Sequence, residues 1–169
     1  MKLAAFEAIC TALNDARVRF LVAVGLAVNA HGYLRLTYDV DLVVQLDPKN
    51  IAAAFKALAT LGYQPSVPVT VAQFADIKQR KDWIKNKHMQ VLNFHGGRQQ
   101  QIPVDMFVTE PFDFNTEYKA AIRGRLAPGL TVRFVSIPTL IKMKKLANRP
   151  KDLDDIGHLR AIAKTKERS

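Results

Sequence analysis

The stretch RLTYDVDLVV, residues 35–44, places two aspartates, Asp39 and Asp41, at the start of a run that otherwise has the character of a buried strand. An ionised carboxylate is costly to bury unless a positive group meets it. Side chains alternate along a strand, so Asp39 and Asp41 share one face, about 7 Å apart, and can share a divalent cation. The stretch therefore predicts a metal site, although an isolated D-x-D is also common as a turn or a cap.

A third acid, Asp105, lies within the apolar run IPVDMFV at 102–108, where nothing local explains it. If that run is a strand beside the first, three carboxylates converge, and their mutual repulsion calls for a metal. Mg²⁺, a hard ion that takes carboxylate and phosphate oxygens, fits best, with Mn²⁺ as an alternative. Three histidines lack metal-ligand spacing and are expected at the surface: His88, His95 and His158.

The composition indicates a globular protein with a polyanionic partner or substrate. The 169 residues are 49% hydrophobic and 24% charged, and 25 Lys and Arg against 15 Asp and Glu give a net charge of +10. Such a surplus makes nucleic acid or nucleotide binding more favourable. The single cysteine, Cys10, has no partner for an internal disulfide, which indicates a reducing compartment and a small buried hydrophobe.

The chain lacks the pattern of a secretory or membrane protein. Residues 1–16 are amphipathic and interrupted by Glu7, unlike a signal peptide. The longest apolar run, 20–28, is about half the length that a membrane span needs. We therefore expect a soluble, cytoplasmic protein with no membrane partner.

The pattern of elements predicts the α/β (α+β) class, with a mixed sheet flanked by helices and further helices at the C-terminal end. One domain is expected over 1–169, with a core at about 18–110 and a C-terminal hairpin and helices at about 115–165. Strands are expected at 19–24, 39–46, 89–94, 102–108, 121–126 and 131–135. Helices are expected at 26–31, 48–61 with Asp47 as its cap, 71–87, 136–146 with Ser136 as its cap, and 151–164, with a loop at 64–70.

Two longer motifs resemble a known family. GLAVNAHGYLRLTYDVDLVV at 25–44, with the later Asp105, resembles the nucleotidyltransferase superfamily, whose fold is like that of DNA polymerase β. Together with LIKMKKLANRPKDLDDI at 140–156, it resembles small bacterial nucleotidyltransferases related to abortive-infection and type IV toxin–antitoxin toxins. The resemblance spans roughly residues 20–160, and implies the nucleotidyltransferase fold.

The resemblance implies an enzyme that transfers the nucleotidyl group of a nucleoside triphosphate (NTP) to an acceptor and releases pyrophosphate. Asp39 and Asp41 would hold Mg²⁺ on the triphosphate, and Asp105 would complete a second metal site or accept the acceptor's proton. Gly25, at a strand-to-helix turn, would let backbone N–H groups approach the phosphates. Leu26 departs from the family, which usually has Gly-Gly or Gly-Ser there.

The implied nucleotide-binding residues come from both motifs: Gly25, Leu26, Arg35, Thr37, Lys144 and Asp152. Arg35 would stabilise phosphate charge, pair with an aspartate or form a surface salt bridge. Lys144 would bind triphosphate with Asp152 orienting either Lys144 or the acceptor, or the two would form an interhelical ion pair with Arg149 and Asp155 as neighbours. Asn29 and His31 have a more ordinary interpretation as polar residues at a helix end.

A basic segment, KQRKDWIKNKH at 78–88, suggests where an RNA acceptor would bind, through Lys78, Arg80, Lys81, Lys85 and Lys87. Trp83 would stack on a base or anchor the helix, and a solvated helix face is the more ordinary explanation of the charges. A protein or a small molecule is the other possible acceptor. The alternative functions are a catalytically weak or inactive relative that binds RNA, and a protein-interaction module held by a cognate antitoxin.

Overall fold

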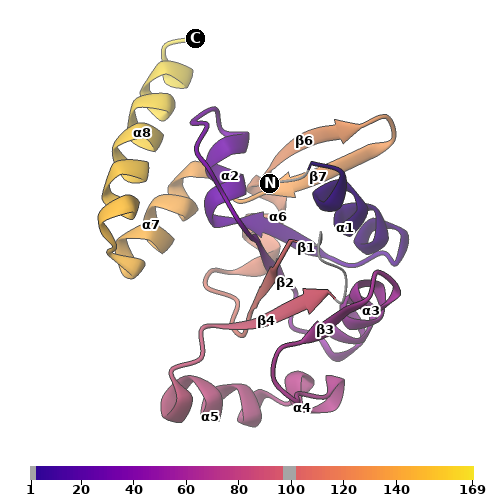
Figure 1. Cartoon of the computed structure of the whole chain (residues 1–169). Coiled ribbons are helices and arrows are strands. Elements are labelled where there is room, and N and C mark those ends of the chain that lie inside the picture. The colour runs from indigo at the N-terminus through magenta and orange to yellow at the C-terminus, as the bar shows by residue number, and fades with distance from the viewer. Residues whose placement is uncertain (1–2, 97–101) are drawn as a thin grey trace.

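The structure is a computed structural model that describes residues 3–96 and 102–169. It confirms the predicted class, with a mixed seven-stranded sheet flanked by helices and two helices at the C-terminal end (Figure 1). The strands are β1 (Phe20–Ala23), β2 (Val40–Val44), β3 (Tyr63–Pro65), β4 (Val91–Gly96), β5 (Val104–Phe107), β6 (Ile122–Ala127) and β7 (Leu130–Phe134). The helices are α1 (Leu3–Asp15), α2 (Val24–Ala30), α3 (Pro48–Thr60), α4 (Val71–Ala75), α5 (Ile77–Lys87), α6 (Phe114–Ala120), α7 (Ile137–Ala147) and α8 (Pro150–Glu167).

The sheet order, β3-β4-β5-β2-β1-β7-β6, brings distant parts of the sequence into one row. β1 runs antiparallel to β2 and places Ala23 opposite Asp41. β2 runs parallel to β5 and places Asp41 beside Asp105. β5 pairs antiparallel with β4, where Asn93 lies opposite Asp105. The candidate site therefore lies on a row of four paired residues, one from each of four neighbouring strands: Ala23, Asp41, Asp105 and Asn93.

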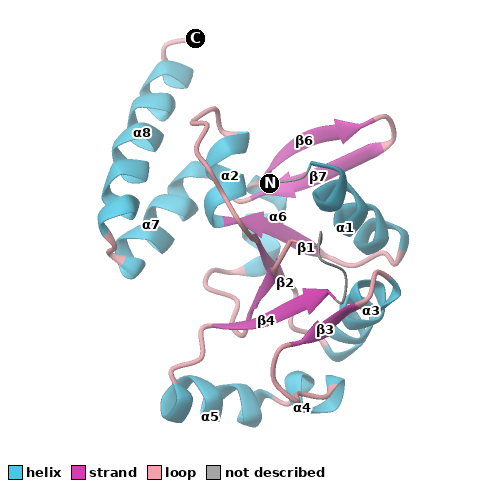
Figure 2. Cartoon of the chain, in the orientation of Figure 1, coloured by secondary structure: helices cyan, strands magenta, loops and turns pink. Residues whose placement is uncertain are grey.

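The helices bury the middle of the sheet and leave one face of β4 open. All residues of β1 and β2 are buried, whereas β4 alternates between the buried Leu92 and Phe94 and the exposed Asn93 and His95. Helices α1 and α3 pack on each other, and α7 and α8 form a second pair next to α2 (Figure 2). Asn93, on this exposed face of β4, lies opposite Asp105 of β5.

Three sequence predictions for the region between β2 and β7 were wrong or incomplete. The expected loop at 64–70 begins with the short edge strand β3, which pairs with β4. The expected helix at 71–87 is broken at Asp76, whose extended backbone (φ −78°, ψ 114°) and side chain, accepting from the Lys78 N–H, start α5 anew. Aspartate favours such caps over helix interiors. Helix α6 was not predicted, although Asp113 caps it through the Thr116 N–H.

Other predicted elements are confirmed with small changes. Asp47 caps α3 by accepting from the Lys49 N–H, with Pro48 in the first turn. Both hairpins are present, although residue 97 of the turn expected at 95–97 lies outside the described residues. Ser136 precedes α7, but its side chain makes no capping hydrogen bond. The carboxylate of Glu117 instead holds the start of α7, accepting from the Ser136 N–H at 2.6 Å and from the Thr139 hydroxyl at 2.6 Å.

Two smaller expectations concern Cys10 and membrane spans. Cys10 is fully buried in α1, which raises the pKa of its thiol to about 12 and leaves it unreactive at neutral pH. Within residues 3–96 and 102–169, no helix has both the length and the apolar character that crossing a membrane requires.

Candidate active site

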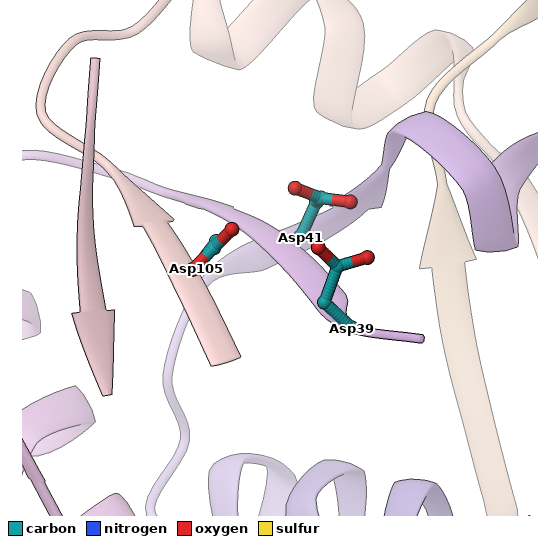
Figure 3. Close-up of side chains that lie close together, drawn as sticks. All are labelled: Asp39, Asp41 and Asp105. Carbon is teal, nitrogen blue, oxygen red and sulfur yellow. The ribbon is translucent and has the colours of Figure 1, made fainter. Parts of the chain in front are cut away.

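Three carboxylates meet where β2 and β5 lie side by side. Asp39 directly precedes β2, Asp41 lies within it, and Asp105 lies at the paired position of β5 (Figure 3). One carboxylate oxygen from each lies within 4.8 Å of the other two. The alternation of the strand accounts for the first two, and the parallel register of β5 brings in the third.

The cluster has the electrostatics of a cation site. Burial, together with the charges of Asp39 and Asp105, raises the pKa of Asp41 to about 7, while Arg149 and Lys144 oppose the shift. Three hard oxygen donors at this spacing suit Mg²⁺ or Mn²⁺, and a divalent ion would remove the repulsion that raises the pKa. The residues present therefore fit the metal that the sequence predicted.

The strand-to-helix turn beside Asp41 is closed by packing on one side. A Cβ atom built on Gly25 would lie 2.4 Å from Thr37 Cγ2 and 3.1 Å from Arg35 Nη2. The preceding Val24 has a positive φ of 53°, a conformation that a β-branched residue rarely adopts. Gly25 is thus needed so that the loop carrying Arg35 and Thr37 can cross over the start of α2.

We expect Gly25→Ala to lower the free energy of unfolding by about 1–3 kcal/mol, because the added methyl overpacks the contact with Thr37. Urea denaturation measures this loss. In a Thr37→Ser background, which lacks Cγ2, the same change should cost much less. Gly157→Ala is the matched control, since nothing lies within 4 Å of its added Cβ, and it should stabilise α8 by about 0.5–1 kcal/mol. Equal losses in both backgrounds would contradict the packing explanation.

The loop between α2 and β2 is pinned to the helix by Asn29. Its Nδ2 donates to Arg35 O at 3.0 Å, and its Oδ1 accepts from the Arg35 N–H at 3.0 Å. His31 Nε2 lies 2.8 Å from Val135 O. Both residues therefore have the helix-end polar role that the sequence favoured.

Beside this loop lies an open groove of about 510 Å³ between α1, α2 and the β6–β7 hairpin. Leu26, Arg35 and Thr37, three of the predicted nucleotide-binding residues, line it together. Its other walls are mainly apolar, with Arg123 as a second cation. Among the described residues that line the groove, none is acidic. The groove can take an apolar, planar or anionic group.

Arg35 of the first motif and four residues of the second motif form a chain of alternating charges. Arg35 Nε lies 3.2 Å from Asp155 Oδ1, and Lys144 Nζ lies 2.6 Å from Asp155 Oδ2 and 3.4 Å from Asp152 Oδ1. Arg149 Nε completes the chain at 2.7 Å from Asp152 Oδ2. We call this set the ion-pair chain.

Exposure differs sharply along the ion-pair chain. The side chain of Lys144 is 3% exposed and that of Arg149 is 51% exposed. Burial alone would raise the pKa of Asp152, but hydrogen bonds from Arg149 and the nearby positive charges hold it below its usual value. Lys144 and Asp152 thus form the interhelical ion pair that was one of the two predictions, with Arg149 and Asp155 as neighbours.

The basic segment needs a correction at Arg80. Arg80 is buried, donates to Phe74 O and lies over the Phe74 ring, so it cannot contact RNA phosphates as predicted. Trp83 is also buried against Phe74 and anchors α5 in the core, the second of its two predicted roles. The remaining cations are exposed: Lys78, Lys81, Lys85 and Lys87.

The sequence interpretation missed the residues that hold Asp105. Asn93 Nδ2 donates to Asp105 Oδ1 at 2.6 Å, and Ser66 Oγ donates to Asn93 Oδ1 at 2.6 Å. A signal was present, since Asn93 and His95 alternate with the apolar Leu92 and Phe94. Ser66 gave no such signal, because it follows an edge strand that the sequence did not reveal.

The chain has the nucleotidyltransferase fold. A solution structure of the antibiotic-resistance factor ANT(2'')-Ia matches with a TM-score of 0.56 and 13% identity, covering 98% of this chain and 92% of that one. A crystal structure of ANT(2'')-Ia in complex with adenylyl-2''-tobramycin matches with a TM-score of 0.58 and 11% identity, covering 99% and 98%. No protein-family model and no curated protein matches the sequence. The predicted relationship to abortive-infection and toxin–antitoxin enzymes stays a prediction.

Proposed function

We propose that this chain is a nucleotidyltransferase that transfers a nucleoside monophosphate from an NTP to an acceptor and depends on Mg²⁺ or Mn²⁺. The observation that carries the proposal is the meeting of Asp39, Asp41 and Asp105 on neighbouring parallel strands. The shared fold with ANT(2'')-Ia supports it. The whole chain would act as one domain.

In this proposal Asp39 and Asp41 hold the metal, with Asp105 as a further ligand or as the base. When bound, the metal neutralises charge on the triphosphate oxygens. The acceptor's hydroxyl or amine attacks the α-phosphorus, and the bond to pyrophosphate breaks as the new bond forms. The proton released by the acceptor passes to the Asp105 carboxylate, which must be ionised to receive it.

Arg149 is the cation best placed to meet the triphosphate. It lies close enough to Asp41 to lower the pKa of that residue, and half of its side chain is exposed. Asp152 holds the guanidinium, accepting from Nε at 2.7 Å and from the Arg149 backbone N–H at 3.1 Å. We therefore assign Lys144 a positioning role, in place of the direct phosphate contact that the resemblance implied, and keep for Asp152 the orienting role that it implied.

The groove beside Thr37 is the proposed place for the nucleoside. Thr37 and Asp39 are two residues apart, so the groove begins within about 7 Å of the metal site along the chain. Leu26 is half-buried and lines this groove. The leucine that departs from the family pattern would thus contact the base or the ribose.

We expect Leu26→Ala to raise KM for the NTP about 5- to 30-fold with little change in kcat, because removing contact area costs roughly 1–2 kcal/mol of binding. Steady-state kinetics with varied NTP measures this effect. Leu34→Ala is the matched control, since Leu34 is 82% exposed on the loop that follows α2 and does not line the groove. An unchanged KM would place the nucleoside elsewhere.

The charge of the chain bears on the class of acceptor. Tobramycin, which the ANT(2'')-Ia complex contains in adenylylated form, is a polycation, whereas this chain carries an excess of positive charges, with a net charge of +10. These charges repel a polycationic acceptor and favour a neutral or anionic one. RNA remains a candidate through the exposed lysines of 78–87, and a cognate antitoxin as partner stays a prediction.

The proposal is tested by incubating the protein with each NTP labelled at its α-phosphate, Mg²⁺, and total RNA, total protein or a small-molecule extract. Label should pass to one acceptor pool, and EDTA should stop it. Mg²⁺ and NTP together should also stabilise the protein against heat more than either alone, by about 2.7 kcal/mol at 100 times the dissociation constant. Absence of both transfer and joint stabilisation would reject the proposal.

A further inference from the structure

A line of polar side chains crosses the open face of the sheet toward Asp105. It starts at His95 on β4, passes through Ser66, directly after edge strand β3, and Asn93 on β4, and reaches Asp105 on β5. The register accounts for the alignment, since Asn93 lies opposite Asp105. Asn93 and His95 are two residues apart and so share one face of β4. We call these three residues, Ser66, Asn93 and His95, the polar row.

The direction of donation along the polar row follows from counting protons. An ionised carboxylate only accepts, so the Asn93 amide must turn its Nδ2 toward Asp105 Oδ1, 2.6 Å away. Its Oδ1 then accepts from Ser66 Oγ at 2.6 Å, which uses the single hydroxyl proton. His95 Nδ1, 3.0 Å from Ser66 Oγ, must therefore carry its own proton and donate. Every donor in the row thus points toward Asp105.

The backbone reinforces this arrangement. Ser66 N–H donates to Asn93 O at 2.8 Å, so Ser66 is hydrogen-bonded to Asn93 through both its backbone and its hydroxyl. Asn93 in turn contacts one of the two Asp105 oxygens. No hydrogen bond from residues 3–96 or 102–169 reaches the other oxygen, which can meet a cation or the proton of an acceptor.

The hydrogen bond from Asn93 favours the ionised form of the Asp105 carboxylate, which its other surroundings disfavour. Burial raises its pKa and the charge of Asp39 adds to the shift, whereas the hydrogen bond from Asn93 favours the ionised form. Hydrogen bonds that orient a metal-binding carboxylate typically change metal affinity or activity 10- to 100-fold.

We propose that Asn93, held by Ser66, is a positioning residue that fixes the Asp105 carboxylate and leaves one of its oxygens free for the metal or the acceptor. This inference rests on the proposed function, because it assigns a task to Asp105 within the same site. It adds two residues that neither sequence motif contains.

The test measures Mn²⁺ affinity by calorimetry, together with label transfer, for a matched set of variants of the full chain. Asn93→Ala should weaken Mn²⁺ binding about 10- to 100-fold, and Ser66→Ala should weaken it by less, since Asn93 keeps its contact with Asp105. Asn86→Ala should leave it unchanged. Asn86 is the matched control because its Nδ2 also donates to a carboxylate at 2.6 Å, that of Asp82 on α5.

A double-mutant cycle separates positioning from a general effect on the fold. In an Asp105→Asn background, Asn93→Ala should change Mn²⁺ affinity less than twofold, because the carboxylate that it orients is gone. If wild type binds Mn²⁺ but Asn93→Ala behaves like Asn86→Ala, the positioning role is wrong and the proposed function stands. If Asn93→Ala lowers Mn²⁺ affinity equally with and without the Asp105 carboxylate, the positioning role is also overturned. If wild type neither binds Mn²⁺ nor transfers label, the proposed function itself fails.

Discussion

Asp41→Asn is expected to lower kcat/KM for nucleotidyl transfer by about a thousandfold or more. Asp41 is the central carboxylate of the three, beside Asp105 across the strands and two residues from Asp39. Metal-ion stabilisation of developing charge is worth several kcal/mol, and each 1.36 kcal/mol is a factor of ten in rate. The amide keeps the shape of the side chain and removes the charge that binds the cation.

The rate is measured by pyrophosphate release over a range of Mg²⁺ concentrations. Asp47→Asn is the matched control, because Asp47 is an exposed acid that caps α3, a role that asparagine fills equally well. It should keep the wild-type rate. Activity of Asp41→Asn within tenfold of wild type would remove Asp41 from the metal site.

The same substitution is expected to stabilise the metal-free protein at neutral pH. The pKa of Asp41 is about 7 in the fold against an ordinary value of 3.8, so between these values the folded state binds more protons than the unfolded state. Stability therefore falls as the pH rises from about 4 to about 7. Asparagine carries no charge to bury, so the gain from Asp41→Asn should grow over that range to at most about 4 kcal/mol.

Urea denaturation in EDTA, from pH 4 to pH 8, measures this gain. The two proteins should be nearly equal in stability at pH 4 and should diverge toward pH 8, where saturating Mg²⁺ should reverse their order. Asp47→Asn should follow wild type throughout. A metal-free wild type that is the more stable protein at pH 8 would show that Asp41 is not destabilising in its ionised form.

The acids were predictable from sequence because their signal is local. The alternation of Asp39 and Asp41 with apolar residues fixes their common face, and Asp105 stands out in an apolar run. The strand-to-helix turn at Gly25 and the cap at Asp47 are likewise encoded within a few residues. These features need no knowledge of which strands become neighbours.

What the sequence did not reveal depends on contacts between distant segments. The short strand β3 exists because it pairs with β4, and Ser66 meets Asn93 only through that pairing. The sequence predicted Arg80 to be a surface cation, but in the fold Arg80 contacts Phe74 and is buried. The sequence left two roles open for Lys144, which were binding triphosphate or forming an interhelical ion pair. The ion pair depends on the packing of α7 on α8, a contact between helices that the sequence alone does not reveal.

The ion-pair chain also has a consequence for the order of folding. Arg35 and Asp155, joined at 3.2 Å, are separated by about 120 residues, so this contact forms only after most of the chain has been made. At ordinary rates of synthesis the delay is on the order of ten seconds. During that time the loop of Arg35 and Thr37 lacks its carboxylate partner, and the acids of β2 lack the nearby cations of α7 and α8. We therefore expect a chain released from the ribosome before Asp155 to have the strands of its sheet but a loosely held loop, and to be an early target of proteases.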